Sequence, residues 1–160
     1  MRRRVYIETT IPIFYFEPRS EPEMVARRSW TRRWWDEAVA ADKYEVVTSV
    51  AVIEELSRGG FQARDMCLGL MGRLPLVPVE PAVAEIVRTY IARQVMPLDP
   101  VGDALRLALA SYHRCDFLVT WNCRHLANAN KFSHIRRVNT MFGSICPGAG
   151  DASGTAGRRR

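Results

Sequence analysis

Carboxylate and amide side chains recur in this 160-residue sequence where apolar, β-prone runs end or where the next helical segment begins. The candidates near such boundaries are Glu8, Glu54 or Glu55, Asp103, Asp116 and Asn122. Converging carboxylates repel one another unless a cation compensates their charge, and oxygen ligands favour a hard divalent metal such as Mg²⁺ or Mn²⁺. Such a metal keeps several waters, one of which can be activated to attack a phosphodiester. The set therefore predicts hydrolysis of a nucleic acid backbone.

Each acid also has an ordinary structural explanation. Asp103 lies in the first turn of a helical segment, where the helix dipole favours any carboxylate. Asp116 precedes the apolar run 117–121, so we expect it at the opposite end of the sheet and as a poor ligand. Glu54 and Glu55 point about 100° apart on a helix, so only one of them can face a common site.

Strands alternate with helices along the chain. The predicted strands cover residues 5–7, 45–48, 74–79, 117–121 and 135–138. The predicted helices cover residues 24–41, 49–59, 62–73, 81–94, a segment from 99 onward, and a short one at 125–130. This alternation favours an α/β fold with a parallel sheet and helices on both faces. Ligands of such sheets bind beyond the carboxyl ends of the strands, which is where most of the candidate residues lie.

Local signals refine these elements. Pro12 predicts a break after the first strand, and the prolines within 74–79 predict an edge strand. Ser49 is a candidate cap for a helix that ends at Gly59 by the usual C-terminal signal, and Asp99-Pro100 predicts another helix start. In that last helix, helical spacing places on one face Val101, Leu105, Ala108 and Tyr112.

Composition is that of one globular domain, with 48% hydrophobic and 25% charged residues. No apolar run approaches the roughly 18 residues that a membrane span needs. Only three residues separate Arg4 from Glu8, which is too few for the apolar core of a secretion signal. We therefore expect a cytoplasmic protein without a membrane partner. The net charge of +6 matches the six arginines at 2–4 and 158–160, which either hold phosphates or are solvated ends.

The four cysteines, Cys67, Cys115, Cys123 and Cys146, form no C-x-x-C pair, which makes a structural zinc site improbable and reduced thiols the expectation. The helix at 24–41 mixes tryptophans with arginines, and we favour a packed apolar face with a charged reverse over a base-stacking platform. Residues 147–160 carry no core-forming pattern, so we predict a domain over 1–146 and a disordered tail.

Three motifs, VYIETTIP, SVAVIEELSRG and GDALRLALASYHRCDFLVTWNCRHLAN, together resemble the PIN-domain family, in particular its VapC-like bacterial branch. The resemblance covers residues 4–143. It implies a three-layer α/β/α sandwich and a Mg²⁺- or Mn²⁺-dependent endoribonuclease. It also implies a toxin acting on RNA that is restrained by a cognate antitoxin, and a homodimer.

The resemblance assigns catalytic roles to Glu8, Glu55, Asp103 and Asn122, of which the three acids would hold the metal. Thr9, Thr120 and His125 would support the site, although a histidine at a helix start is more often satisfied by backbone groups. Two positions depart from the family. The first acid is Glu8 where Asp is common, and Asn122 offers an oxygen without a charge.

These departures leave a second hypothesis open: a catalytically degenerate PIN-fold module that binds RNA or a protein without cutting. A nucleotide-binding oxidoreductase is disfavoured because no G-x-G-x-x-G follows the first strand.

Overall fold

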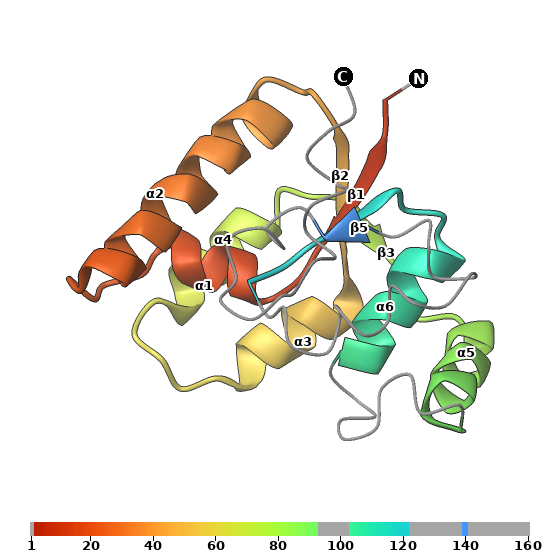
Figure 1. Cartoon of the computed structure of the whole chain (residues 1–160). Coiled ribbons are helices and arrows are strands. Elements are labelled where there is room, and N and C mark those ends of the chain that lie inside the picture. The colour runs from red at the N-terminus through yellow and green to blue at the C-terminus, as the bar shows by residue number, and fades with distance from the viewer. Residues whose placement is uncertain (1, 93–102, 122–138, 141–160) are drawn as a thin grey trace.

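A five-stranded parallel sheet forms the centre of the protein in this computed structural model (Figure 1). The structure describes residues 2–92, 103–121 and 139–140, without the side chains of 90, 91, 103, 104, 139 and 140. Its strands, in the spatial order β3-β2-β1-β4-β5, are β1 (Arg4–Ile7), β2 (Glu45–Ser49), β3 (Leu76–Val77), β4 (Phe117–Val119) and β5 (Asn139–Thr140). Every neighbouring pair is parallel. The predicted α/β fold is confirmed, as is the place of β3 at an edge.

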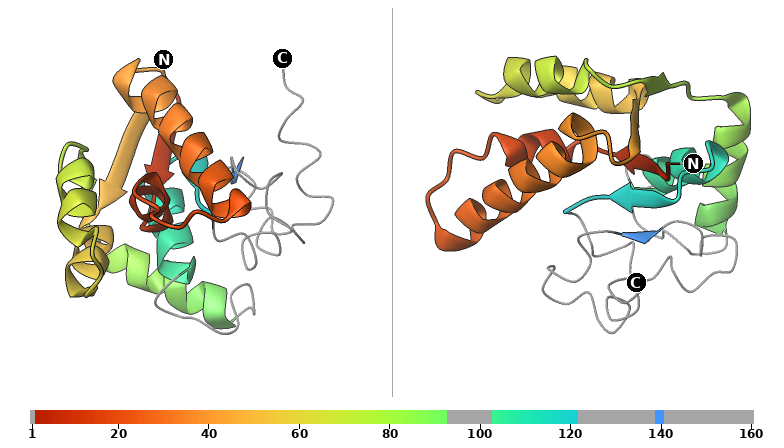
Figure 2. Two further views of the ribbon diagram at one scale, coloured as in Figure 1. Left: turned by 90° about the vertical axis from the view of Figure 1, so that its left-hand side faces the viewer. Right: turned by 90° about the horizontal axis from the view of Figure 1, so that it is seen from above.

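Helices cover both faces of this sheet. They are α1 (Thr10–Tyr15), α2 (Pro22–Trp35) with a π-helical turn η1 (Asp36–Ala40), α3 (Val50–Arg58), α4 (Arg64–Met71), α5 (Pro81–Ala92) and α6 (Asp103–Tyr112). Figure 2 shows α1, α2 and α4 on one side of the strands and α5 with α6 on the other. The three-layer sandwich is therefore confirmed.

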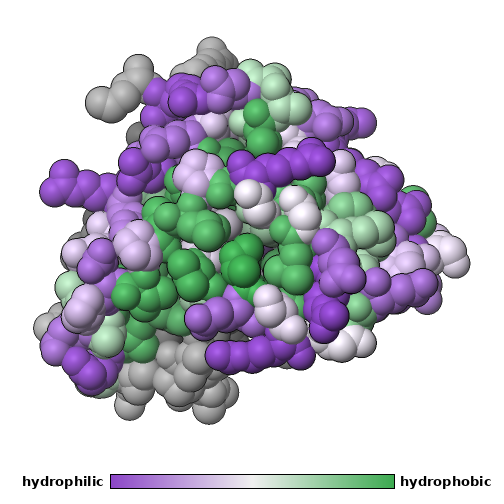
Figure 3. All heavy atoms as spheres, turned by 180° about the vertical axis from the view of Figure 1, so that it is seen from behind, coloured by the Kyte–Doolittle hydropathy of each residue, from purple (hydrophilic) through white to green (hydrophobic). Residues whose placement is uncertain are grey.

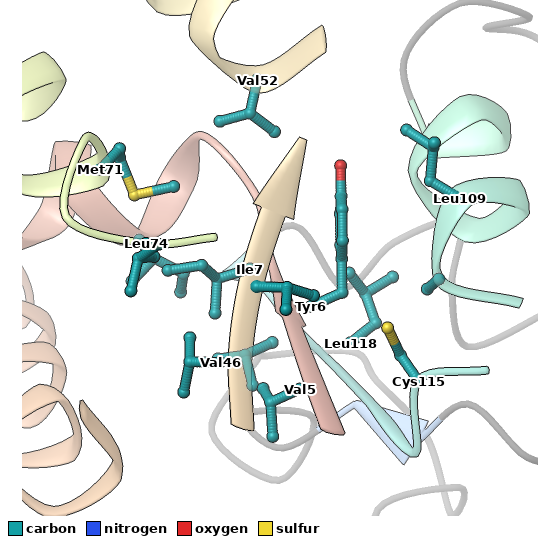
Figure 4. Packing of buried hydrophobic residues seen from close by; sticks show 14 of the residues in the cluster. Val5, Tyr6, Ile7, Val46, Val52, Met71, Leu74, Leu109, Cys115 and Leu118 are labelled. Atoms are coloured by element: carbon teal, nitrogen blue, oxygen red, sulfur yellow. The ribbon is translucent and has the colours of Figure 1, made fainter. Parts of the chain in front are cut away.

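The neighbouring strands β1 and β4 are largely apolar, as is typical of parallel strands that are buried on both faces. Val5, Tyr6 and Ile7 of β1 have no exposed surface, and Leu118 and Val119 of β4 are equally buried. Side chains of both helical layers pack against them (Figure 4). In the register of β1 and β4, Ile7 pairs with Val119, so the residues that follow these two strands emerge side by side.

The first strand is followed by a helix where Pro12 predicts a break, so that expectation is wrong. Pro12 is the third residue of α1, and the first turn of a helix has no need of its missing N–H donor. Gly59 ends α3 as predicted but not through a left-handed backbone, since its φ is −71°. A Cβ atom there would lie 2.5 Å from Cε1 of Phe61, so close packing explains the glycine.

The predicted apolar face of α6 is only partly right. Tyr112 is 41% exposed, whereas four consecutive residues, Leu107, Ala108, Leu109 and Ala110, are buried. The reason is that α6 packs on both α5 and β4, so it is covered over more than one face. Several predictions lie outside the described residues: Val101, the Asp99-Pro100 helix start, the strand at 135–138, the helix at 125–130 and the tail at 147–160.

The helix rich in tryptophan and arginine buries one side as predicted. Trp34 and Trp35 are each 5% exposed, while Arg32, Arg33 and Trp30 lie on the exposed side. Figure 3 shows apolar side chains gathered on the face opposite to that of Figure 1. Large hydrophobic side chains are exposed at Ile13, Trp30, Val50, Met66, Leu76, Val79 and Tyr112.

Two of the cysteines, Cys67 and Cys115, are buried and unbridged. Burial raises the pKa of Cys67 to about 11 and that of Cys115 to about 12, so both stay protonated thiols at neutral pH. In the part of the chain that is described, no helix is long and apolar enough to cross a membrane.

Candidate active site

Glu8 follows β1 directly and is fully buried at the carboxyl edge of the sheet. Its Oε2 accepts a hydrogen bond from Oγ1 of Thr9 at 3.1 Å. Its Oε1 accepts from the backbone N–H of Thr10 at 3.1 Å and from the hydroxyl of the same threonine. A buried carboxylate is tolerated only with such partners, so the Glu-Thr-Thr sequence supplies its own support.

Glu55 lies on α3, the helix that follows β2. Ser49 ends β2 and caps α3, its Oγ accepting from the backbone N–H of Val52 at 3.3 Å. The same Oγ lies 2.9 Å from the hydroxyl of Tyr6, and burial raises the pKa of Tyr6, so the phenol remains a neutral hydrogen-bonding group. These contacts fix the start of α3 beside β1.

The two adjacent glutamates of α3 point in different directions, as helical geometry predicts. Both oxygens of Glu55 accept hydrogen bonds from Arg106, at 2.8 and 2.9 Å. Glu54 is 62% exposed and lies 3.8 Å from Arg58 on the same helix. Helical geometry, which turns the two side chains about 100° apart, accounts for the difference.

Arg106 of α6 joins the two acids. Its Nε lies 3.4 Å from Oε2 of Glu8, and its Nη2 donates to Glu55 and to Oγ1 of Thr9, the latter at 3.2 Å. The side chain of Arg106 is 12% exposed, whereas that of Glu55 is 53% exposed. A single guanidinium therefore balances one buried and one half-exposed carboxylate, which come from different elements.

Two threonines and a tryptophan complete the described side of the site. Thr10 Oγ1 accepts from the backbone N–H of Trp121 at 2.9 Å and lies 3.5 Å from Oγ1 of Thr120, which is 1% exposed. Thr10 thus links the residues after β1 to those after β4. The predicted supporting positions of Thr9 and Thr120 are next to Glu8 and Thr10, respectively.

Three of the predicted site residues are not described, or only in part. Asp103 is the first residue of α6 and lies three positions before Arg106, but its side chain is outside the described part, as are Asn122 and His125. Asp116 lies at the amino end of the sheet, where its Oδ2 accepts from the backbone N–H of Arg4 at 2.8 Å. The predicted place of Asp116 at the opposite end of the sheet is confirmed.

The donor set fits a hard divalent cation. Glu8, Glu55 and the neighbouring hydroxyls offer only oxygen, and the two carboxylates already converge on one positive group. Among the side chains that are described, no group of three or more His, Cys, Asp and Glu gathers in one place. A third acid would have to come from outside them, as Asp103 would.

Sequence reasoning missed Arg106 and Thr10. The sequence signal for Arg106 was its spacing from Asp103. A residue three positions after Asp103 lies about one turn further along α6 and on the same side of the helix. The signal for Thr10 was its place beside Thr9 after the first strand. Neither could be given a partner without knowing which strands are neighbours.

Comparison of the sequence with protein-family models and with curated proteins gives no match. The structure is similar to the crystal structure of FitAcB from Neisseria gonorrhoeae, with a TM-score of 0.53 and 16% sequence identity. The likeness covers 85% of this chain and 95% of that chain. At this identity the likeness shows the fold alone, which is an α/β sandwich of three layers.

Proposed function

We propose that the protein is a metal-dependent endoribonuclease that hydrolyses RNA phosphodiester bonds, and that it is the toxin of a type II toxin-antitoxin pair. The observation that carries the proposal is the convergence of Glu8 and Glu55 on one cationic group at the carboxyl edge of a parallel sheet. The three motifs that resemble the PIN-domain family support RNA as the substrate.

In this proposal the ligands of Mg²⁺ or Mn²⁺ are Glu8, Glu55 and Asp103. When bound, the metal supplies Lewis-acid stabilisation and lowers the pKa of a bound water for attack on phosphorus. Thr9 and Thr10 keep the Glu8 carboxylate fixed through their hydrogen bonds, so that its oxygens are aimed before the metal arrives. Asn122 positions water or a neighbouring ligand, and Thr120 and His125 support it.

The partners proposed are an RNA substrate, a cognate antitoxin protein and a second copy of the chain, in the cytoplasm. The exposed apolar side chains on several elements are compatible with a protein partner.

A second candidate is the non-cutting binding module. It is favoured by one observation: Arg106 already neutralises the two described carboxylates, as a permanent structural ion pair would. In that case the site would not need a metal.

Calorimetric titration with Mn²⁺ separates these functions. We expect the wild type and the Glu54→Gln variant to bind Mn²⁺ equally, and the Glu55→Gln variant to bind at least about tenfold more weakly. The control is matched because Glu54 is the neighbouring glutamate on α3 and pairs only with Arg58 at 3.8 Å among its described ion pairs. No heat from the folded wild type would favour the binding module, and equal binding by all three proteins would remove Glu55 from the site.

A further inference from the structure

We propose that Arg106 is a phosphate-binding residue of the nuclease, held by Glu8 and Glu55 until a divalent cation takes these carboxylates. The inference rests on the proposed function and adds a residue to it. Without metal, the guanidinium of Arg106 pairs with the two glutamates. With metal bound, it pairs with a phosphate of the RNA.

The first state is the one in the structure. Arg106 reaches from α6 to α3 and to the end of β1, and Figure 1 shows α3 and α6 at the same end of the sheet. Its Nη2 contacts both oxygens of Glu55 and Oγ1 of Thr9, while Nε faces Glu8. Since the guanidinium is 12% exposed and Glu8 is fully buried, the cation compensates a carboxylate that water does not reach.

The guanidinium and a metal cannot share these carboxylates as they stand. The oxygens of Glu55 both accept from Nη2, and Oε2 of Glu8 faces Nε and accepts from Thr9. A divalent cation bound by the same oxygens would lie against the guanidinium and repel it. Metal binding therefore requires Arg106 to move, and Arg106 lowers the affinity of the site for metal.

Phosphate is the anion that the displaced side chain would meet. The planar fork of an arginine matches two phosphate oxygens, and the guanidinium stays charged at any physiological pH. Arg106 is anchored on α6 beside the carboxylates, so its reach is limited to the neighbourhood of the metal. A phosphodiester that approaches the metal comes within reach of Arg106. Its phosphate oxygens then replace the carboxylates of Glu8 and Glu55 as partners of the guanidinium.

This arrangement differs from the surface ion pairs of the protein. Arg58 and Glu54 are 79% and 62% exposed and lie one turn apart on α3, so nothing prevents either from being solvated. Arg58 is therefore the matched control, because its replacement removes the same charge from the protein close to Glu55 without touching Glu8 or Glu55.

The test compares R106Q with R58Q and the wild type in Mn²⁺ titrations. We expect R106Q to bind Mn²⁺ about tenfold more tightly than the wild type and R58Q to bind as the wild type does. Should R106Q fail to fold without metal, R106K replaces it. A single ammonium cannot contact both carboxylates as the fork does, so R106K should also bind Mn²⁺ more tightly than the wild type.

The second arm measures binding of a 2′-O-methyl oligonucleotide in saturating Mn²⁺, with its integrity checked on a denaturing gel. R106Q should bind this probe more weakly than R58Q, and the slope of log affinity against log salt should fall by about one relative to the wild type. Equal probe affinity and slope in R106Q and R58Q would overturn the phosphate role.

Failure of the inference is distinct from failure of the proposed function. If the wild type binds Mn²⁺ and cuts RNA but R106Q binds Mn²⁺ no more tightly, Arg106 is a fixed structural partner and the inference alone is wrong. If none of the proteins binds Mn²⁺, the metal site itself is wrong and the inference falls with it.

Discussion

Replacement of Glu8 by glutamine should reduce Mn²⁺-dependent RNA cleavage at least about a hundredfold and leave the protein folded. Glutamine keeps the size of the side chain and one oxygen acceptor but removes the charge that a metal needs. Arg106 keeps both hydrogen bonds to Glu55, so the remaining charges stay paired. Initial rates of RNA cleavage at saturating Mn²⁺ measure the effect.

Glu17→Gln is the matched control for this variant. Glu17 is likewise buried, 3% exposed, and its Oε1 accepts from Nε of Arg19 at 2.6 Å. This hydrogen bond lowers the pKa of Glu17, so the pair stabilises the fold above the pKa of the unfolded chain and ceases to do so as pH falls through the folded value. Glu17→Gln should therefore lower stability at neutral pH and retain cleavage. Cleavage by Glu8→Gln at the rate of Glu17→Gln would exclude Glu8 from catalysis.

Replacement of Trp121 by alanine should lower the free energy of unfolding by about 3 to 5 kcal/mol. Trp121 is 5% exposed, its Nε1 donates to Oγ1 of Thr31 at 2.9 Å, and its ring lies 5.8 Å from that of Phe14. Arg27 also lies over the ring of Trp121, with its Cζ 5.3 Å from the centroid. Alanine leaves a cavity between β4 and the helices α1 and α2 and removes the hydrogen bond to Thr31, whose hydroxyl still donates to the backbone oxygen of Arg27 at 2.6 Å.

Urea unfolding of Trp121→Ala and of Trp30→Ala tests this account. Trp30 is 44% exposed on α2, next to Thr31, so its removal should cost about 1 kcal/mol or less. Losses of equal size in the two variants would mean that the contacts of Trp121 do not hold α2 against the end of β4.

Much of the sheet could be predicted from sequence because its central strands are short, contain apolar runs and are separated by helices. The runs at 5–7 and 45–48 correspond to β1 and β2 within one residue at each end. The helix at 10–15 was missed because Pro12 suggests a break, although a proline in the first helical turn is compatible with a helix. The order of the strands cannot be read from the pattern, since it depends on which buried faces meet.

The candidate site could be predicted in part for the same reason. Glu8 was found because it follows a strand, whereas position gave only Glu54 or Glu55 and the family resemblance selected Glu55. The structure shows that Glu8 and Glu55 both contact Arg106. Arg106 and Thr10 were missed because an arginine within a helix and a second threonine are common on protein surfaces. Only the spatial neighbours of these residues show that they hold the acids, and the positions of Asn122 and His125 stay predictions.

The most direct test of the central claim is the cleavage of a mixed structured RNA by the purified protein with Mn²⁺, with EDTA, and by the Asp103→Asn variant with Mn²⁺. Asparagine removes one charge at the first residue of α6 and leaves the helix intact. We predict cleavage by the wild type with Mn²⁺ and none in either of the other reactions. Cleavage that persists in EDTA or in the Asp103→Asn variant would contradict the account.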